Sequence, residues 1–316
     1  MEIKENVLLA QFTTLHVGGP ARFFCEAKDE KEIAEALEFA REENLPVFAL
    51  GGGSNILVSD KGFDGIVIRI MNYELGITNN NISCGAGMLL SKIVNESVKF
   101  GLTGMEWAAG IPGTVGGAIR GNAGALGSCM AEAVENVRLI DAEKIDSKEK
   151  EELGIRNYES GGCEFRYRDS IFKHNPDLII ISAILKLKKG EREASEKKVR
   201  EIIKQRKSAQ PFDFPSSGSF FKNPKSDSEK LMRELERDTG KKATGGVVPA
   251  GYLIERAGLR GKKIGGAMVS QNHGNFLVNA GNAKAEDFII LIALVKTKIR
   301  NKFGIQLQEE VQYVGF

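Results

Sequence analysis

Two glycine-rich segments are the residues of this 316-residue sequence whose type and spacing first suggest chemistry. Gly51, Gly52 and Gly53 follow the apolar run 47–50, and a second segment, 110–127, contains seven glycines in eighteen residues. Because glycine has no side chain, it lets the backbone approach a ligand and present consecutive N–H groups to an anion such as a diphosphate. A simple tight turn at residues 51–53 is the alternative.

The second glycine segment differs from a flexible linker, which would be polar and rich in Gly and Ser. It interleaves Ile111, Val115 and Ile119 with the glycines, which indicates packed backbone suited to a flat, extended ligand. A Rossmann loop needs Gly-x-Gly-x-x-Gly opening a helix, whereas an apolar strand pattern follows Gly53. The sequence also contains no Gly-x-x-x-x-Gly-Lys-Ser/Thr. If a dinucleotide binds here, its site is therefore of a non-Rossmann type.

A few polar side chains could serve a reaction at such a site. On residue type alone, Arg168 is a loop cation, Ser219 a turn serine and His273 a loop histidine. Strand alternation over 305–314 places Glu309 on the face of Leu307 and Val311, so periodicity selects Glu309 as the buried carboxylate. The neighbouring Glu310 remains the alternative.

The elements that must position these residues can be read from periodicity and end signals. Asp29 and Glu32 predict a capped helix over 29–41, and Asn282 is the expected cap of a long helix that ends at Gly304. The other expected helices lie at 89–100, around the basic stretch 196–207, and at 249–258. Strands are expected at 47–50, 56–58 paired with 65–70, 82–84, 134–140, 178–187 and 305–314.

Composition limits the class of protein. The net charge of +2 gives no reason to expect nucleic acid, and four scattered cysteines indicate neither a metal cluster nor a disulfide framework. With no signal peptide and no apolar run long enough to span a bilayer, we expect a cytoplasmic protein without a membrane partner.

We predict an α+β fold divided at 1–72, 73–208 and 209–316. The polar stretches 146–162 and 226–239 are expected to be surface insertions.

The glycine motifs, taken together, resemble those of a known family. Residues 51–57 (GGGSNIL), 110–118 (GIPGTVGGA) and 122–125 (NAGA) are similar to the FAD-binding region of the UDP-N-acetylenolpyruvoylglucosamine reductase family. Further similarity lies in 165–170 (FRYRDS), 218–224 (GSFFKNP), 250–258, 273–279 and 309–315, so that it covers nearly the whole chain in order. The implied fold is the two-subdomain FAD-binding region of the vanillyl-alcohol-oxidase or p-cresol-methylhydroxylase type, followed by a C-terminal α+β substrate domain.

The resemblance also implies a reaction. The family reduces UDP-N-acetylglucosamine enolpyruvate to UDP-N-acetylmuramate for peptidoglycan, passing a hydride from NADPH to non-covalent FAD and then to the substrate. By motif register, Arg168 stabilises the enolate, Ser219 donates the proton and Glu310, rather than Glu309, is the carboxylate partner. The register implies substrate contacts for Tyr167, Lys222, Asn223 and His273. It implies FAD contacts for Leu50, Gly51, Gly52, Gly53, Ser54, Asn55, Gly110, Ile111, Pro112, Gly113, Val115, Gly116, Gly117, Ala118, Asn122, Ala123 and Gly124, and no metal.

Two other functions remain open from the sequence. A flavin oxidase of the same fold, acting on a small alcohol or hydroxy acid, would leave Arg168, Ser219 and Glu310 without a role. A non-catalytic flavin- or nucleotide-sugar-binding protein would hold FAD that NADPH does not reduce. Residues 171–193 leave no room for the substrate-capping Tyr loop found in part of the family, so the chain resembles the shorter form.

Overall fold

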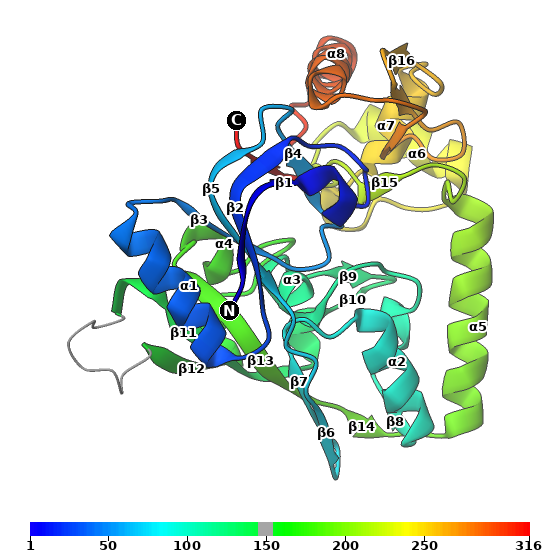
Figure 1. Ribbon diagram of the computed structural model, residues 1–316. Helices are drawn as coiled ribbons and strands as arrows, with labels where there is room; N and C mark the ends of the chain where they lie inside the picture. Colours follow the sequence, from blue (N-terminus) through cyan, green and yellow to red (C-terminus); the bar gives the residue numbers. More distant parts are fainter. Residues whose placement is uncertain (145–153) are drawn as a thin grey trace. The chain divides into compact units, whose positions relative to one another are not determined.

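The chain folds into two compact units. The computed structural model describes residues 1–144 and 154–316 (Figure 1). The first unit comprises Met1–Val7, Ala21–Gly53 and Phe63–Arg206, and the second comprises Leu8–Pro20, Ser54–Gly62 and Lys207–Phe316. Two short N-terminal segments therefore belong with the C-terminal third of the chain. The finer division at 1–72, 73–208 and 209–316 stays a prediction.

The first unit begins with a four-stranded sheet in the order β1 (Ile3–Leu8), β2 (Pro20–Ala27), β5 (Phe63–Ile70) and β3 (Val47–Leu50). Both β2 and β3 pair with β5 in parallel. Helix α1 (Glu30–Glu42) starts as predicted, because the carboxylate of Asp29 accepts the Glu32 N–H at 2.9 Å. The strand β3 leads directly into Gly51, so this sheet determines where the first glycine segment starts.

The second sheet of this unit is antiparallel. Its order is β12 (Ile155–Glu159), β11 (Val134–Asp141), β13 (Leu178–Lys186), β7 (Asn81–Gly85) and β6 (Leu75–Thr78). The remaining elements of the unit are the helices α2 (Leu90–Lys99), α3 (Val115–Arg120), α4 (Ile171–His174) and α5 (Arg192–Ala209) and the short strands β8 (Leu102–Thr103), β9 (Gly124–Ala125), β10 (Ser128–Cys129) and β14 (Lys188–Lys189). The strands expected at 82–84, 134–140 and 178–187 are confirmed, as is the helix expected at 89–100.

A buried carboxylate ties α5 to the residues that precede the second glycine segment. Glu106 is 2% exposed and accepts hydrogen bonds from Ser195 on α5 and from Thr103, both at 2.6 Å, and from the Gly104 N–H at 3.0 Å. Burial alone raises the pKa of Glu106, but these hydrogen bonds outweigh it and hold the pKa below its usual value. The charged Glu106 carboxylate therefore connects α5 to residues 103–104 through three hydrogen bonds.

The second unit is built on an antiparallel sheet in the order β15 (Ser216–Ser219), β18 (Phe276–Asn279), β17 (Ala267–Val269) and β16 (Lys263–Ile264). Its helices are α6 (Glu229–Thr239), α7 (Ala250–Arg256) and α8 (Ala285–Phe303). Phe220, Phe221 and Phe288 are among its fully buried side chains. A separate parallel pair joins β4 (Ile56–Val58) to β19 (Gln312–Val314).

The pairing of β4 corrects one prediction. Residues 56–58 were expected to pair with 65–70, but they pair with the far end of the chain, where Ser59 N–H donates to Val314 at 2.9 Å. Apolar alternation identifies a strand and carries no information on its partner, so a contact this distant in sequence was not predictable. The closing strand is also shorter than the predicted 305–314, because only Gln312–Val314 forms a ladder.

The start of α8 corrects a second prediction. Asn282 was expected to cap the helix, but the helix begins at Ala285 and its first N–H groups are taken by Asp60. The two carboxylate oxygens of Asp60 accept from Ala285 at 2.8 Å and from Glu286 at 3.0 Å. Asn282 has a φ of +52° and lies outside the helix. A carboxylate from a distant segment thus replaces the local cap.

The two polar stretches have different outcomes. Residues 146–153 of the stretch 146–162 lie outside the described residues, and residues 155–159 of that stretch form β12. The stretch 226–239 contains helix α6, whose Leu231 and Leu235 are buried in the core of the second unit, and its description as a surface insertion stays a prediction. Its polarity in sequence reflects the solvent-facing side of an amphipathic helix.

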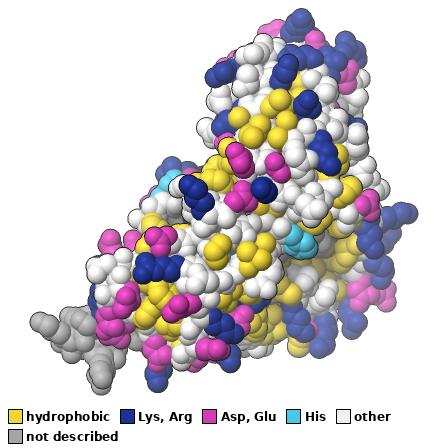
Figure 2. All heavy atoms as spheres, turned by 45° about the horizontal axis from the view of Figure 1, so that its top comes forward, with side chains coloured by type: hydrophobic (Ala, Val, Ile, Leu, Met, Phe, Trp, Pro, Cys, Tyr) yellow, Lys and Arg dark blue, Asp and Glu magenta, His cyan; other side chains and the backbone are white. Residues whose placement is uncertain are grey.

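The surface carries charges of both signs. On the face in Figure 2, lysine and arginine side chains are interspersed with aspartate and glutamate. Within residues 1–144 and 154–316, no helix is long and apolar enough to cross a membrane.

We predict that Asp60→Ala lowers the free energy of unfolding by about 1–2 kcal/mol, because two N–H groups of α8 lose their acceptor. Urea unfolding followed by circular dichroism measures the loss. Asn282→Gly is the matched control, since glycine suits the positive φ there, and it should leave stability nearly unchanged. Equal losses in both variants would show that Asp60 is not the cap.

Candidate active site

The two glycine segments of the first unit are in direct backbone contact. A Cβ atom added to Gly51 would lie 2.5 Å from Thr114 Oγ1, and one added to Gly52 would lie 2.9 Å from Gly113 Cα. Neither distance is possible for a real side chain without displacement of the neighbour. Glycine at these positions is therefore required by packing, and the resulting surface consists mainly of backbone.

This surface has the chemistry of an anion site. Among the described residues, no acceptor takes the backbone N–H groups of Gly51, Gly52 and Gly53. Three consecutive N–H groups without a protein partner form the kind of concave donor set that binds phosphate oxygens. The residues present thus fit the diphosphate of a dinucleotide. Leu50, at 2% exposure, is the buried last residue of β3, the strand that leads into them.

Neighbouring segments hold the second glycine stretch in place. The N–H of Gly116 donates to Ala86 at 2.9 Å, and Leu90 N–H donates to Gly113 at 3.1 Å. On the other side, the guanidinium of Arg206 donates to the carbonyl of Trp107 at 3.2 Å, and its Cδ lies 3.0 Å from where a Cβ on Gly110 would be. Burial lowers the pKa of Arg206 from its usual value. These contacts hold the backbone of the second glycine segment in place.

Arg168 lies in a tight turn beside this segment. Arg166 and Asp169 exchange two backbone hydrogen bonds of 3.0 and 3.1 Å, which leaves Tyr167 and Arg168 at the tip. Arg168 has a φ of +55°, a conformation that costs a non-glycine residue about 1–2 kcal/mol. Its guanidinium donates to the carbonyl of Gly124. Strain of this kind is found at functional positions held by the surrounding structure.

Tyr167 is an exposed residue of the turn. It is 54% exposed, and the Arg168 guanidinium lies 5.3 Å from the centroid of its ring. The turn thus presents an aromatic face and a cation together, next to the start of β9, where the Arg168 guanidinium donates to the Gly124 carbonyl.

Ser219 is exposed by a bulge in the second unit. Ser216 pairs with Val278 and Ser219 with Phe276, so β15 contains one residue more than its partner strand, and Gly218 has a φ of +76°. A bulge redirects side chains, and here Ser217 is buried while Ser219 is exposed to solvent. The turn serine expected from sequence is thus a strand residue aimed outward.

The chain brings Glu310 next to the Ser219 segment. The Glu310 N–H donates to the carbonyl of Phe220 at 2.9 Å, and the Glu310 carbonyl accepts from the Asn55 side chain at 3.2 Å. Three motifs that are distant in sequence therefore meet in the second unit. This contact also assigns Asn55 a structural bond within the protein, in addition to the FAD role expected for it.

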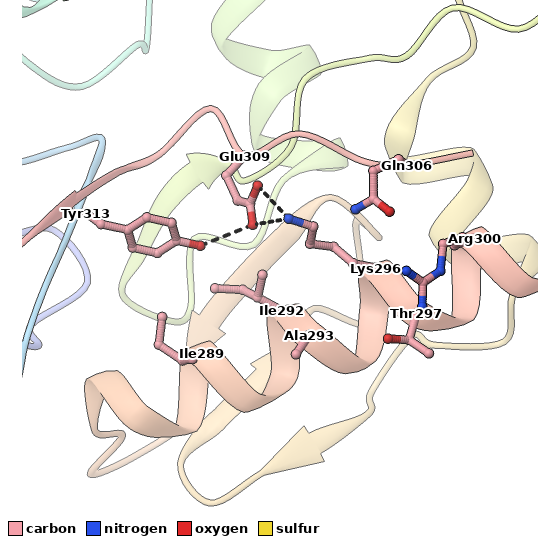
Figure 3. A pocket seen from close by; sticks show the side chains of 9 residues that line it. All are labelled: Ile289, Ile292, Ala293, Lys296, Thr297, Arg300, Gln306, Glu309 and Tyr313. Atoms are coloured by element: carbon pink, nitrogen blue, oxygen red, sulfur yellow. Dashed lines mark hydrogen bonds and ion pairs between the residues drawn. The ribbon is translucent and has the colours of Figure 1, made fainter. Parts of the chain in front are cut away.

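Glu309 points into a different environment. Both of its oxygens contact Lys296 Nζ, at 2.7 and 3.0 Å, and the Tyr313 hydroxyl donates to it at 3.3 Å (Figure 3). These side chains line a hollow of about 390 Å³ along α8. Burial, reinforced by Glu309, raises the pKa of Tyr313. Glu309 is therefore the half-buried carboxylate that periodicity selected, but it is neutralised by a lysine.

The expected substrate residues of the second unit have defined neighbours. The side-chain oxygen of Asn223 accepts the Ala250 N–H at 2.9 Å, so Asn223 caps α7, and Lys222 N–H donates to Gln308 at 2.8 Å. His273 Nδ1 accepts the Asn275 N–H at 3.1 Å, which places the proton of the neutral ring on Nε2. Burial lowers the pKa of His273 from its usual value, so the ring is an uncharged donor.

The structure divides the expected catalytic residues between the units. Ser219 and Glu310 belong to the second unit, where their segments are bonded, and Arg168 belongs to the first. Sequence reasoning missed Ser170 and Asn275. Asn275 exchanges hydrogen bonds of 3.0 and 2.8 Å with the backbone of Phe221 and so fixes the segment after Ser219. Both residues lie inside recognised motifs, but residue type alone does not distinguish them from their neighbours.

Comparison with known proteins agrees with this geometry. Residues 21–143 match the model of the FAD binding domain family, and residues 210–314 match the C-terminal domain of UDP-N-acetylenolpyruvoylglucosamine reductase. The chain is 36% identical over 320 residues to the reductase of Solibacter usitatus, covering 100% of this chain and 97% of the relative. It is 38% identical over 322 residues to that of a Synechococcus species, covering 99% and 94%.

A solved structure extends the agreement to three dimensions. The crystal structure of UDP-N-acetylenolpyruvylglucosamine reductase from Thermus caldophilus matches with a TM-score of 0.76 and 32% identity, covering 99% of both chains. Fold and site together define an FAD-containing oxidoreductase with an FAD-binding region and a C-terminal domain, as the sequence predicted. The chain belongs to the UDP-N-acetylenolpyruvoylglucosamine reductase family.

We predict that Gly52→Ala greatly weakens FAD binding, because its Cβ would force the 51–53 segment away from Gly113. The FAD content after purification and the dissociation constant from flavin fluorescence measure this effect. Gly161→Ala, also in the first unit, has no atom within 4 Å of the added Cβ and should bind FAD normally. Normal FAD affinity in Gly52→Ala would disprove a cofactor site at this contact.

Proposed function

We propose that this chain reduces the enolpyruvyl group of UDP-N-acetylglucosamine enolpyruvate to the lactyl ether of UDP-N-acetylmuramate. Its family membership and FAD-binding region support the reaction. The observation that supports the assignment of residues is the backbone hydrogen bond from the Glu310 N–H to the carbonyl of Phe220, the residue after Ser219. Bound FAD, when reduced by NADPH, supplies the hydride that adds to the terminal carbon of the enolpyruvyl group.

Arg168 has the chemistry to stabilise the charge that follows. Hydride addition to the terminal carbon places negative charge on the adjacent carbon and its carboxylate. A guanidinium held in one orientation stabilises such an enolate more than a mobile lysine would, since its fixed fork matches a carboxylate. The bond from Arg168 to Gly124 and the strained turn supply that fixed orientation.

Ser219 is proposed as the proton donor. A hydroxyl that protonates the enolate carbon must be accessible to the substrate, and the bulge at Gly218 exposes Ser219. Donation leaves a charged serine oxygen, which needs a nearby group to return a proton. Glu310, on the segment bonded to Phe220, is the proposed partner.

The remaining roles are also proposals. Tyr167, Lys222 and His273 bind the substrate, while Asn223 acts on it through the helix α7 that it caps. FAD binds non-covalently. We further propose that the protein is cytoplasmic, which is supported by its four cysteines being free thiols, as expected in a reducing compartment.

Anaerobic mixing tests the function. We expect NADPH to bleach the bound flavin and UDP-N-acetylglucosamine enolpyruvate to restore its colour, with UDP-N-acetylmuramate as the product detected by mass spectrometry. Oxygen is the comparison oxidant, since a flavin oxidase would be reoxidised faster by oxygen than by the nucleotide sugar. Bleached flavin that the nucleotide sugar does not reoxidise would disprove the proposal.

A matched pair of variants separates the adjacent glutamates. Glu310→Gln should slow flavin reoxidation by the substrate at least 100-fold, in line with the roughly 10²–10⁴-fold contribution of general acid–base groups. Glu309→Gln removes only the ion pair with Lys296, so reoxidation should stay within about twofold and stability should fall by about 1 kcal/mol. Stopped-flow absorbance and urea unfolding measure both. The reverse pattern would assign the role to Glu309.

A further inference from the structure

The strained turn of Arg168 is held by two buried polar side chains. Asn122 is 4% exposed, and its Nδ2 donates to the carbonyl of Arg166 at 2.8 Å. Ser170 is 1% exposed, and its hydroxyl donates to the carbonyl of Arg120 at 2.6 Å. The first bond is accepted by the residue two positions before Arg168, and the second is donated by the residue two positions after it. The turn is thus fastened on both sides.

Both side-chain hydrogen bonds connect the turn to residues 120–124, at the end of the second glycine segment. Arg120 ends α3, Asn122 follows it, and Gly124, which accepts from Arg168, begins β9. Asn122 is itself held, because its Oδ1 accepts the Ala131 N–H at 3.1 Å and its φ is +41°. Both polar groups of the Asn122 side chain are therefore engaged within the protein, although the sequence suggested that this residue contacts FAD.

We propose that Asn122 and Ser170 are positioning residues that hold Arg168 in its strained conformation and so set the orientation of its guanidinium toward the substrate. The inference rests on the proposed function, in which Arg168 stabilises the enolate. Without the two bonds, the turn relaxes to an ordinary φ and the guanidinium leaves its place. Misplacement of a reacting group by about 1 Å can cost 100-fold in rate.

The test uses variants that remove one bond each. Ser170→Ala deletes the hydroxyl, and Asn122→Asp keeps the acceptor for Ala131 while losing the donor to Arg166. Ser195→Ala is the matched control, because Ser195 is also buried in the first unit and also donates at 2.6 Å, but to Glu106. Melting temperature and FAD content verify that each variant folds with its cofactor.

We expect Ser170→Ala and Asn122→Asp to slow flavin reoxidation by the enolpyruvyl substrate at least tenfold, and Ser170→Ala to leave reduction by NADPH unchanged within twofold. Ser195→Ala should lower the melting temperature without slowing reoxidation. Adding Ser170→Ala to Arg168→Ala should cost nothing further, since residues that act through one another are not additive. A crystal structure of Ser170→Ala should show that Arg168 no longer contacts the Gly124 carbonyl.

The outcomes separate this inference from the function on which it rests. Slow reoxidation in Arg168→Ala with normal rates in Ser170→Ala and Asn122→Asp overturns the positioning role alone. A further loss when Ser170→Ala is added to Arg168→Ala also overturns it. Normal reoxidation in Arg168→Ala overturns the proposed role of Arg168, and the positioning role with it.

Discussion

The close approach of two backbone segments, 51–52 and 113–114, is the constraint on which the cofactor site depends. Side chains cannot be accommodated at this contact, so the wall presented to a ligand is made of peptide groups. Peptide N–H groups bind an anion without the cost of burying an opposing charge, and they are fixed by the sheet that ends at Leu50 and by bonds to the segment around Ala86. This close contact explains why glycine occupies positions 51 and 52.

The second glycine segment also supports Arg168, the residue proposed to stabilise the enolate. The turn at Tyr167 and Arg168 is attached to the end of the second glycine segment through Arg120, Asn122 and Gly124. The proposed cofactor site and the arginine proposed to stabilise the enolate are therefore attached to the same segment. A free arginine loop would lose orientation to conformational entropy, whereas this one is held in a conformation that it would not adopt alone.

The second unit exposes the Ser219 hydroxyl and bonds the backbone of Glu310 to the residue that follows Ser219. A single additional residue in β15 turns Ser219 outward, and Asn275 fixes the strand that follows. The adjacent glutamates have different partners. Lys296 neutralises the carboxylate of Glu309, whereas the backbone N–H of Glu310 donates to the Phe220 carbonyl in the Ser219 segment. The hollow along α8 belongs to Glu309 and not to the proposed proton donor.

Local patterns in the sequence are sufficient to predict several secondary-structure elements and the class of chemistry. Helix α1 with its Asp29 cap, strand β3 and the glycine segments follow from periodicity, short-range hydrogen bonds and the absence of a Cβ, all of which act within a few residues. Motif resemblance added the reductase assignment. The contacts between distant residues become visible in the folded chain: β4 pairs with β19, Asp60 caps α8, Glu309 pairs with Lys296, and Asn122 and Ser170 donate to the carbonyls of Arg166 and Arg120. These contacts depend on long-range packing, which residue type and spacing do not encode in any local pattern.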